Sequence, residues 1–378
     1  MNRRRLTVLL AVVLLVAAYA VWCRLGRSLP DAPLDLHLKS FMVYGKDSGR
    51  GNILCVQPYV LPSDYENPVR FRNKLFEYLL EAQNRGWIGS KTVVVFPEYI
   101  GAWLVVADEK RGVYTSPTVD GAMKLMVASN PVSFARAAAS AKGPDRLKDA
   151  PFRMKAQRMA SIYDNAFYLM ARNYGVTIVA GSIILPSPRI VEGRLEAGDG
   201  PLYNVSVVYG PDGKAYQTIV VKSYPTKDEQ TFISAGEVQD IPVFDTPAGR
   251  LGVLICADAW FPRAYEVMKA KKASVVVVPS YGLGDNSVLK RTWPGYSGHP
   301  NPKDVTANDP GRIEEWQAFM KYSLPRRLPK SGIPVGAVVS LRGNLWNLGS
   351  HGTTVVVRKG KVEVAPFVDG AALVNVWL

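Results

Sequence analysis

Short runs of consecutive apolar residues constrain the fold of this chain most. Residues 91–96 read KTVVVF and residues 273–280 read ASVVVVPS. A strand with one solvated face alternates apolar and polar residues, whereas these runs offer no polar face. Both faces of such strands must therefore be covered, which predicts sheets that are buried beneath helices.

Strand-length segments outnumber the segments with helical periodicity. The segment 201–222 is typical of a hairpin around the turn Pro211-Asp212-Gly213. An open doubly wound sheet would need more helices, so the balance favours an α/β fold in which two mixed sheets pack on one another with helices outside. The other strands are expected at 51–57, 91–96, 176–185, 251–255, 273–280, 335–341, 352–358 and 371–377, and the helices at 68–86, 151–174, from Pro262 and at 312–323.

The amino-terminal segment differs from the rest of the chain. Residues 6–22 (LTVLLAVVLLVAAYAVW) carry no charge and follow three arginines. A membrane-spanning helix needs about 20 apolar residues, so this run is short but sufficient. We expect residues 1–27 to be a signal-anchor with the body outside the cytoplasm, in the periplasm or the extracellular space, because more positive charge precedes the run than follows it.

Two other fates of this segment stay open. Ala18-Tyr19-Ala20 offers a small-x-small cleavage site, so a cleaved secretory signal peptide is the main alternative. The apolar run continues through Trp22 past that site, which favours retention. Lipid attachment at Cys23 is less favoured, because bulky Trp22 stands where a small residue is required.

Composition indicates one globular body after a short linker. We expect a linker at 28–50 and a single domain at 51–378, with an insertion at about 104–150 where helical patches, prolines and glycines mix. The formal net charge is +14, and subtracting the five arginines that flank the apolar run leaves +9 for residues 28–378. The remaining basic residues are scattered and are not interleaved with aromatic residues. A solvated basic surface is therefore expected, and no nucleic-acid groove.

Cysteine and histidine offer neither a disulfide framework nor a metal site. Their spacings include no CxxC pair and no ligand-like cluster. We therefore expect no bound metal. The residues are Cys23, Cys55, Cys256, His37, His299 and His351.

Three reactive side chains each follow the carboxyl end of an apolar strand. They are Glu98, Lys222 and Cys256, and ligand sites in sheets of this kind gather at such ends. Together they supply a base, a cation and a nucleophile. Each also has a purely structural interpretation, as a turn carboxylate, a solvated strand end and a buried small hydrophobe. The residues alone leave both interpretations open.

The segments around these residues resemble, in order and type, the three motifs of the nitrilase superfamily of carbon-nitrogen hydrolases, in its amidase-like branch. The motifs here are FPEY (96–99), VVKSYP with the glutamate that follows it (220–229), and GVLICADAWFP (252–262). The segments NYGVTIVAGSI (173–183) and YNVSVVYGPDGK (203–214) are also similar to that family. The resemblance implies a four-layer αββα sandwich, usually a homodimer, that needs no metal or organic cofactor.

The resemblance also assigns roles to individual residues. Glu98 is expected to be the general base, Lys222 the cation beside the developing oxyanion, and Cys256 the nucleophile. Glu229 is expected to be the second carboxylate that many members carry after the lysine. The backbone N–H near Ala257 is expected to complete the oxyanion site.

The residues after Cys256 bear on the substrate. Amidase-like members usually carry a bulky aromatic residue where this chain has Ala257, whereas Asp258 and Trp260 keep the amidase-like pattern. The resemblance therefore implies a small-molecule amide or carbamoyl substrate. The alternatives are a membrane-associated N-acyltransferase with the same triad, whose members normally have several membrane spans, and, less favoured, a nitrilase or an inactive binding protein on this fold.

Overall fold

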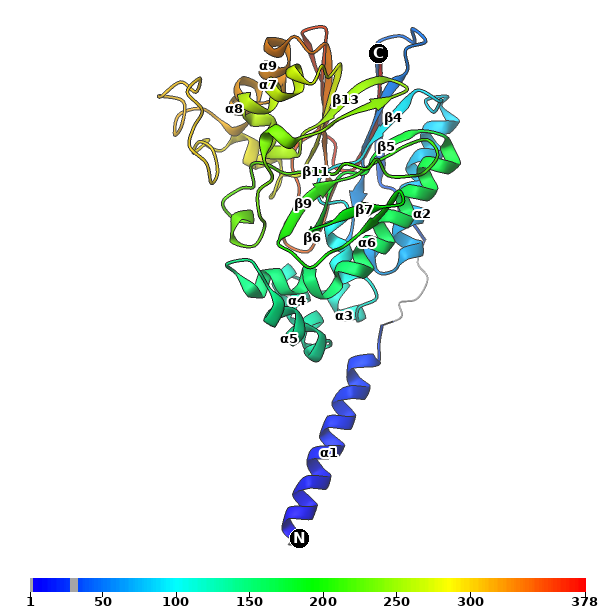
Figure 1. Cartoon of the computed structure of the whole chain (residues 1–378), viewed down its shortest axis with the longest axis vertical. Helices are drawn as coiled ribbons and strands as arrows, with labels where there is room; N and C mark the ends of the chain where they lie inside the picture. The colour runs from blue at the N-terminus through cyan, green and yellow to red at the C-terminus, as the bar shows by residue number, and fades with distance from the viewer. Residues whose placement is uncertain (1–2, 28–32) are drawn as a thin grey trace.

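The computed structural model describes residues 3–27 and 33–378, and two six-stranded mixed sheets form its body (Figure 1). The first sheet has the order β1 (Leu38–Tyr44), β19 (Ala371–Trp377), β2 (Asn52–Gln57), β4 (Thr92–Val95), β5 (Thr177–Val179) and β10 (Val208–Tyr209). The second has the order β12 (Val243–Thr246), β13 (Gly249–Val253), β14 (Val275–Ser280), β15 (Val335–Ser340), β17 (Val355–Arg358) and β18 (Lys361–Val364).

Three smaller sheets hold the connections between the larger elements. They are β11 (Val220–Val221) with β9 (Leu202–Ser206) and β6 (Ile183–Pro186), β16 (Arg342–Gly343) with β3 (Tyr59–Val60), and β7 (Arg189–Val191) with β8 (Arg194–Glu196). The helices are α1 (Arg3–Arg24), α2 (Pro68–Asn84), α3 (Arg111–Tyr114), α4 (Val119–Ala128), α5 (Pro131–Ser140), α6 (Arg146–Tyr174), α7 (Pro262–Ala270), α8 (Glu315–Tyr322) and α9 (Leu324–Ser331).

The apolar strands are buried on both faces, as their composition predicts. In β2, Ile53 and Cys55 belong to a core that also holds side chains of the second sheet. Leu54 and Val56 alternate with them and pack in a different core, together with side chains of α2 and α6. Since successive side chains of a strand point to opposite faces, one strand contributes to both cores. Strands β2 and β4 pair in parallel, as the strand, helix, strand order predicts.

The segment 176–185 is not one strand but two. β5 joins the first sheet and β6 joins a small sheet, because the chain turns sharply at Gly181, where φ is +66°. A Cβ at Gly181 would lie 2.1 Å from the carbonyl oxygen of Pro97, so only glycine fits. The break brings this segment against the turn that carries Glu98.

Helix α6 begins earlier than Pro151, where the sequence predicts its start. It begins at Arg146, because Asp145 caps the helix by accepting hydrogen bonds from the backbone N–H groups of Leu147 and Lys148, both at 3.1 Å. Pro151 consequently lies inside the helix. The carboxyl end at Tyr174, followed by left-handed Gly175, is as predicted.

Part of the segment expected as a linker is a strand. Residues 38–44 form β1, which pairs in parallel with β19 at the edge of the first sheet. The sequence LKSFMVY alternates between half-buried and exposed positions, which is the pattern of an edge strand. Residues 28–32 of that expected linker lie outside the described residues.

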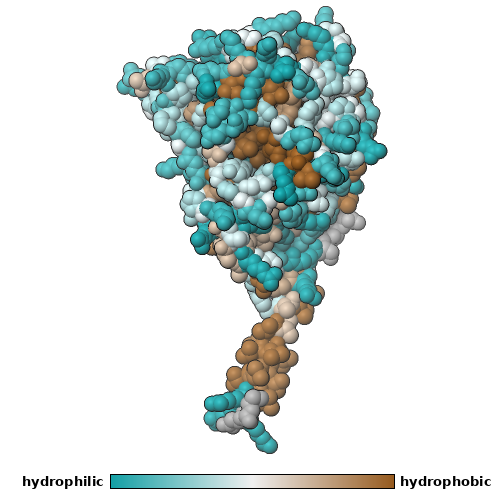
Figure 2. All heavy atoms as spheres, viewed as in Figure 1, coloured by the Kyte–Doolittle hydropathy of each residue, from teal (hydrophilic) through white to brown (hydrophobic). Residues whose placement is uncertain are grey.

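The insertion contributes α3, α4 and α5, which lie at the end of the body where α1 joins it (Figure 1). Helix α1 is long and apolar enough to cross a membrane, and none of its residues is buried. Figure 2 shows it as an apolar rod below a body whose surface is mostly hydrophilic.

Polar contacts hold the carboxyl end of α1 to the insertion. Arg27 Nη1 donates to Glu109 Oε2 at 3.0 Å, and Nη2 donates to Asn130 Oδ1 at 3.1 Å. The Tyr19 hydroxyl donates to the carbonyl oxygen of Ala128 at 2.5 Å. Glu109 is fully buried, so its ion pair with Arg27 is shielded from water.

Candidate active site

A buried cluster of one ammonium and two carboxylates lies at the carboxyl ends of β4 and β11. Lys222 Nζ is 2.8 Å from Glu98 Oε1 and 2.8 Å from both carboxylate oxygens of Glu229. All three side chains are almost completely buried. The structure therefore brings together three of the residues that the sequence singles out.

The turn after β4 positions Glu98. Tyr99 adopts the left-handed conformation with φ of +62°, which is uncommon for a residue with a side chain. Its backbone N–H donates to Ser182 Oγ at 2.9 Å, and the N–H of Gly101 donates to the carbonyl oxygen of Ser182 at 2.9 Å. The break between β5 and β6 thus supplies the partners that fix this turn.

Two further residues complete the cluster, and sequence reasoning does not assign them a role. Asn204 Nδ2, on β9, donates to Glu98 Oε1 at 2.9 Å and to Glu229 Oε1 at 3.3 Å. The Tyr99 hydroxyl donates to Glu229 Oε1. Tyr99 lies within the FPEY motif, and Asn204 is a polar residue in an otherwise apolar hairpin strand, which is the only signal that marks it.

The charges of the cluster give the two carboxylates different proton affinities. Burial raises the pKa of Glu98, and the neighbouring Glu229 adds to the rise while Lys222 opposes it. Burial also acts to raise the pKa of Glu229, but its contacts with Lys222, Tyr99 and the backbone N–H of Thr226 lower that pKa overall. Glu98 is therefore the carboxylate that takes up a proton more readily.

Cys256 lies just after β13, at the start of a 3-10 turn (Cys256–Trp260). Its φ of +47° is left-handed, a strained conformation that is frequent at functional sites. The thiol is 3.4 Å from Ser280 Oγ and 3.9 Å from the carbonyl oxygen of Tyr281, and it lies close enough to Glu98 to interact with its charge. Burial, with the charge of Glu98, raises the pKa of Cys256 to about 12. The resting thiol is therefore protonated and needs a base.

Asp258 links the cysteine turn to the loop that follows Lys222. Its Oδ1 accepts from the backbone N–H groups of Ser223 at 3.0 Å and Tyr224 at 2.8 Å, and its Oδ2 accepts from that of Ile255 at 3.1 Å. Burial raises the pKa of Asp258 to about 7. Both oxygens are engaged with the backbone, so this side chain acts as a positioning residue. Ala257 lies beside it and is half-buried.

A cavity of about 230 Å³ opens beside Cys256. Trp260 lines it together with Trp316 and Phe319, which form an aromatic wall. Polar residues on the lining include Ser280, Glu315 and His351. Of the three residues expected to surround the substrate, Trp260 therefore faces this cavity, and the sequence does not anticipate Glu315.

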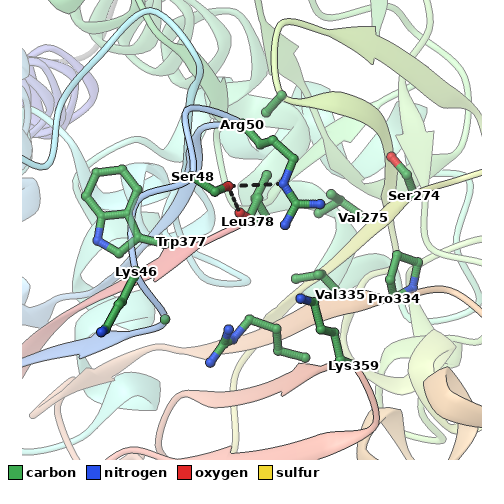
Figure 3. Close-up of a pocket in the computed structure, with 13 residues that line it drawn as sticks. Lys46, Ser48, Arg50, Ser274, Val275, Pro334, Val335, Lys359, Trp377 and Leu378 are labelled. Carbon is green, nitrogen blue, oxygen red and sulfur yellow. Dashed lines mark hydrogen bonds between the residues drawn. The ribbon is translucent and has the colours of Figure 1, made fainter.

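A larger hollow of about 710 Å³ lies elsewhere and holds none of the reactive groups (Figure 3). Its walls include Val275 and Val335, the first residues of β14 and β15, so it lies at the amino ends of these strands. Cys256 follows the carboxyl end of their neighbour β13. The chemistry is therefore assigned to the smaller cavity. The cationic side chains around the larger hollow are Lys46, Arg50, Arg358 and Lys359.

Residues 151–299 match the family model described as carbon-nitrogen hydrolase. This segment contains Lys222, Glu229 and Cys256, while Glu98 lies outside it. A probable hydrolase, YhcX, from Bacillus subtilis (strain 168) is 26% identical over 117 residues, which cover 31% of this chain and 20% of that protein. A deaminated glutathione amidase from Yersinia enterocolitica is 26% identical over 172 residues, which cover 42% of this chain and 52% of that protein. The chain thus spans about a fifth of the length of the first relative and about half of the length of the second.

Solved structures of an amidase from Nesterenkonia sp. share the fold. One crystal structure has a TM-score of 0.51 at 16% identity and covers 86% of this chain and 90% of that chain. A cysteine-to-alanine mutant of the amidase from Nesterenkonia sp. AN1, in complex with butyramide, has a TM-score of 0.52 at 15% identity with the same coverage. The body of this chain therefore has the fold of these amidases.

Proposed function

Because residues 151–299 match the carbon-nitrogen hydrolase family model, we propose that this chain hydrolyses a non-peptide carbon-nitrogen bond, in an amide or a carbamoyl compound, through a thioester on Cys256. One observation carries the proposal: Glu98 contacts Lys222 Nζ at 2.8 Å in a buried cluster and lies near enough to Cys256 for its charge to raise the pKa of the thiol. A base, a nucleophile and a cation are thus held together out of water, where their electrostatic interactions are strong.

The reaction proceeds in two halves. Glu98 takes the thiol proton, the sulfur attacks the carbonyl carbon, and Lys222 with the backbone N–H of Ala257 holds the oxyanion. Glu98 then gives its proton to the leaving nitrogen as the carbon-nitrogen bond breaks. In the second half Glu98 takes a proton from water, the hydroxide attacks the thioester, and the thiolate leaves and is protonated again. Glu98 serves as base and acid because its pKa is raised.

Glu229 holds Lys222 in place and does not transfer protons. It accepts hydrogen bonds from Lys222, Tyr99 and Asn204, and from the backbone N–H of Thr226 at 2.7 Å. These donors keep the carboxylate ionised, in keeping with its lowered pKa. A permanently charged Glu229 offsets the charge of Lys222 and leaves Glu98 free to titrate.

Substitution of the nucleophile tests this proposal. Cys256→Ala should lower the release of ammonia from small aliphatic amides by about 10⁴-fold or more, because removal of a nucleophile leaves only the residual effect of the site. Intact mass spectrometry of the unmodified protein should show an acyl adduct that Cys256→Ala lacks. Cys55→Ala, which removes a buried thiol from β2, should retain activity per folded molecule. Undiminished ammonia release by Cys256→Ala would overturn the assignment.

The same experiment separates hydrolysis from acyl transfer. An added primary amine competes with water for the thioester. Formation of an N-acyl product in place of the free acid would assign the chain to the acyltransferase class. Predominant release of the acid supports the hydrolase.

We also propose the arrangement of the whole chain. The core shared by β2, β4, β13 and β14 supports two sheets packed face to face, with α2 and α6 outside one sheet and α7 and α9 outside the other, in a four-layer αββα sandwich. Homodimerisation is a further part of this proposal. We propose that α1 is a retained signal-anchor with the body outside the cytoplasm. The hydrogen bond from the Tyr19 hydroxyl to the carbonyl oxygen of Ala128 supports retention, because cleavage before Val21 would remove Tyr19 and with it this contact between α1 and the insertion.

A further inference from the structure

We propose that Glu315 and the aromatic wall of the cavity form a subsite for an ammonium group carried by the substrate. The inference rests on the proposed function, since Cys256 is taken as the reacting end of the same cavity. It goes beyond that function by naming a substrate class: small amides or carbamoyl compounds with a positively charged amino group remote from the reacting carbon.

Within the described part of the chain, Glu315 is the only aspartate, glutamate, lysine or arginine that lines this cavity. It is the first residue of α8, and its backbone N–H donates to the carbonyl oxygen of Arg291 at 2.9 Å. Its carboxylate makes no ion pair or hydrogen bond with any residue of 3–27 or 33–378. In a chain with a net charge of +14, the single charge that faces the cavity is negative.

The other titratable side chains of the lining do not compensate this carboxylate. His351 is mostly buried, and burial, with the positive charge of Arg342, lowers its pKa to about 4, so it is neutral at pH 7. Burial alone raises the pKa of Glu315 to about 7, because no cation lies near enough to oppose it. Glu315 is half-buried, and a carboxylate that has lost part of its water without gaining a partner is stabilised by a ligand that supplies a cation.

The aromatic side chains around Glu315 suit a cation. Trp316 stacks on Phe319 with ring centroids 5.3 Å apart, and Trp260 meets Phe319 edge to face at 6.1 Å. Aromatic faces attract ammonium groups, most strongly where water is excluded. A carboxylate beside such faces offers an ammonium group both an opposite charge and an aromatic surface to pack against. A neutral apolar group would leave the carboxylate unpaired.

The dimensions of the cavity restrict the substrate. Its volume of about 230 Å³ is below the roughly 300 Å³ at which typical ligand sites begin. A short linear molecule, with an amide at one end and an ammonium at the other, fits these limits better than a branched or polymeric substrate.

Two probes of equal size test the subsite. They are 6-aminohexanamide and heptanamide, which have the same number of non-hydrogen atoms and differ only in a terminal ammonium or methyl group. At pH 8, where Glu315 is ionised, the unmodified protein should show the higher kcat/KM on 6-aminohexanamide. In Glu315→Gln the ratio of the two kcat/KM values should fall about tenfold or more, which corresponds to about 1.4 kcal/mol.

The neighbouring Glu314 provides a matched control. Its side chain is exposed and caps α8, so Glu314→Gln should leave the ratio unchanged. At pH 6, where Glu315 is largely protonated, the preference of the unmodified protein for 6-aminohexanamide should shrink. A wild-type preference for heptanamide, or a ratio that Glu315→Gln does not alter, overturns the subsite.

A binding measurement separates failure of this subsite from failure of the proposed reaction. Pentylammonium should bind to Cys256→Ala, measured by calorimetry, and binding should weaken about tenfold or more when Glu315→Gln is added. If neither amide is cleaved but this binding depends on Glu315, the subsite stands and the hydrolase proposal fails. If both amides are cleaved but pentylammonium binding does not depend on Glu315, the subsite fails and the hydrolase proposal stands.

Discussion

At the scale of single residues, the two carboxylates that contact Lys222 have different roles in the proposed reaction: Glu98 transfers protons and Glu229 is a counter-ion. Glu229 has four donors that favour its charged form, whereas Glu98 is fully buried and is exposed to the negative charge of Glu229. An acid-base catalyst needs a pKa near the working pH, and a structural counter-ion needs a pKa well below it. The neighbours of each carboxylate therefore decide its role.

This division predicts the pH dependence of the reaction. Turnover needs ionised Glu98, so kcat/KM should rise with pH through a pKa above that of an ordinary glutamate. Glu229→Gln removes a negative charge that raises the pKa of Glu98, so the acidic limb should move to lower pH. Profiles of kcat/KM against pH for the two proteins check this. A limb that stays in place, or moves to higher pH, would show that Glu229 does not act on the base in this way.

At the scale of elements, the insertion and the end of α1 form one polar unit around Glu109. Besides Arg27, this buried carboxylate contacts Lys155, Ser129 and Asn130. Removal of one partner from a buried charge network is costly, because the remaining groups stay desolvated. The insertion therefore depends on residues from α6 and from the segment after α1.

Arg27→Ala should destabilise the full-length protein by about 1.5–3 kcal/mol, the range for hydrogen bonds to charged groups, since Lys155 still neutralises Glu109. Urea denaturation in detergent micelles, followed by circular dichroism, measures this change. Arg24→Ala, which alters an exposed residue one turn earlier, should change stability by less than about 0.5 kcal/mol. Equal effects of the two variants would contradict a specific role for Arg27.

Local patterns predict elements well where the determinants are local. The apolar runs, the cap at Asn67 and the turn around Gly213 mark β2, β4, α2 and the hairpin, and each reactive residue is found because it follows such a run. The break at Gly181 is different, because its cause is the carbonyl of Pro97, more than eighty residues away in the chain. The contacts of Asn204 with Glu98 and Glu229, and the place of Glu315 in the lining of the cavity, arise between segments that are far apart in the chain.

At the scale of the whole molecule, the length of α1 fixes how the body meets a bilayer in the anchored protein proposed here. The apolar run 6–22 spans about 25 Å as a helix, and a hydrocarbon core is about 30 Å thick. All of the apolar run is therefore needed to cross the hydrocarbon core. Tyr19, which lies within this run, contacts Ala128 at the end of α4. The junction between α4 and α5 should therefore lie among the lipid headgroups.

A spin label at Val132 tests this position. Val132 is 62% exposed at the start of α5, two residues beyond that junction. In vesicles, a nitroxide at Val132→Cys should be less accessible to an aqueous nickel complex than one at Val191→Cys, on the β7 and β8 hairpin. Both variants are made in a protein that also carries Cys23→Ser and Cys256→Ala, so that the label reacts only with the introduced cysteine; Cys55 is buried and can stay. The intact mass of the protein must show that α1 is retained. Equal accessibility at the two positions would contradict the predicted depth.

In the anchored protein proposed here, the contact of Arg27 with Glu109 has a consequence for how the proposed active site meets its substrate. A domain joined to its membrane helix by a flexible linker samples every orientation above the membrane. A domain that makes fixed contacts with the segment after that helix keeps one face toward the lipid. The protein then diffuses in the plane of the membrane with a fixed tilt of its body. The mouth of the cavity stays at a constant height above the membrane surface. Small molecules released at or drawn to that surface would meet the thiol more often than those in bulk solution.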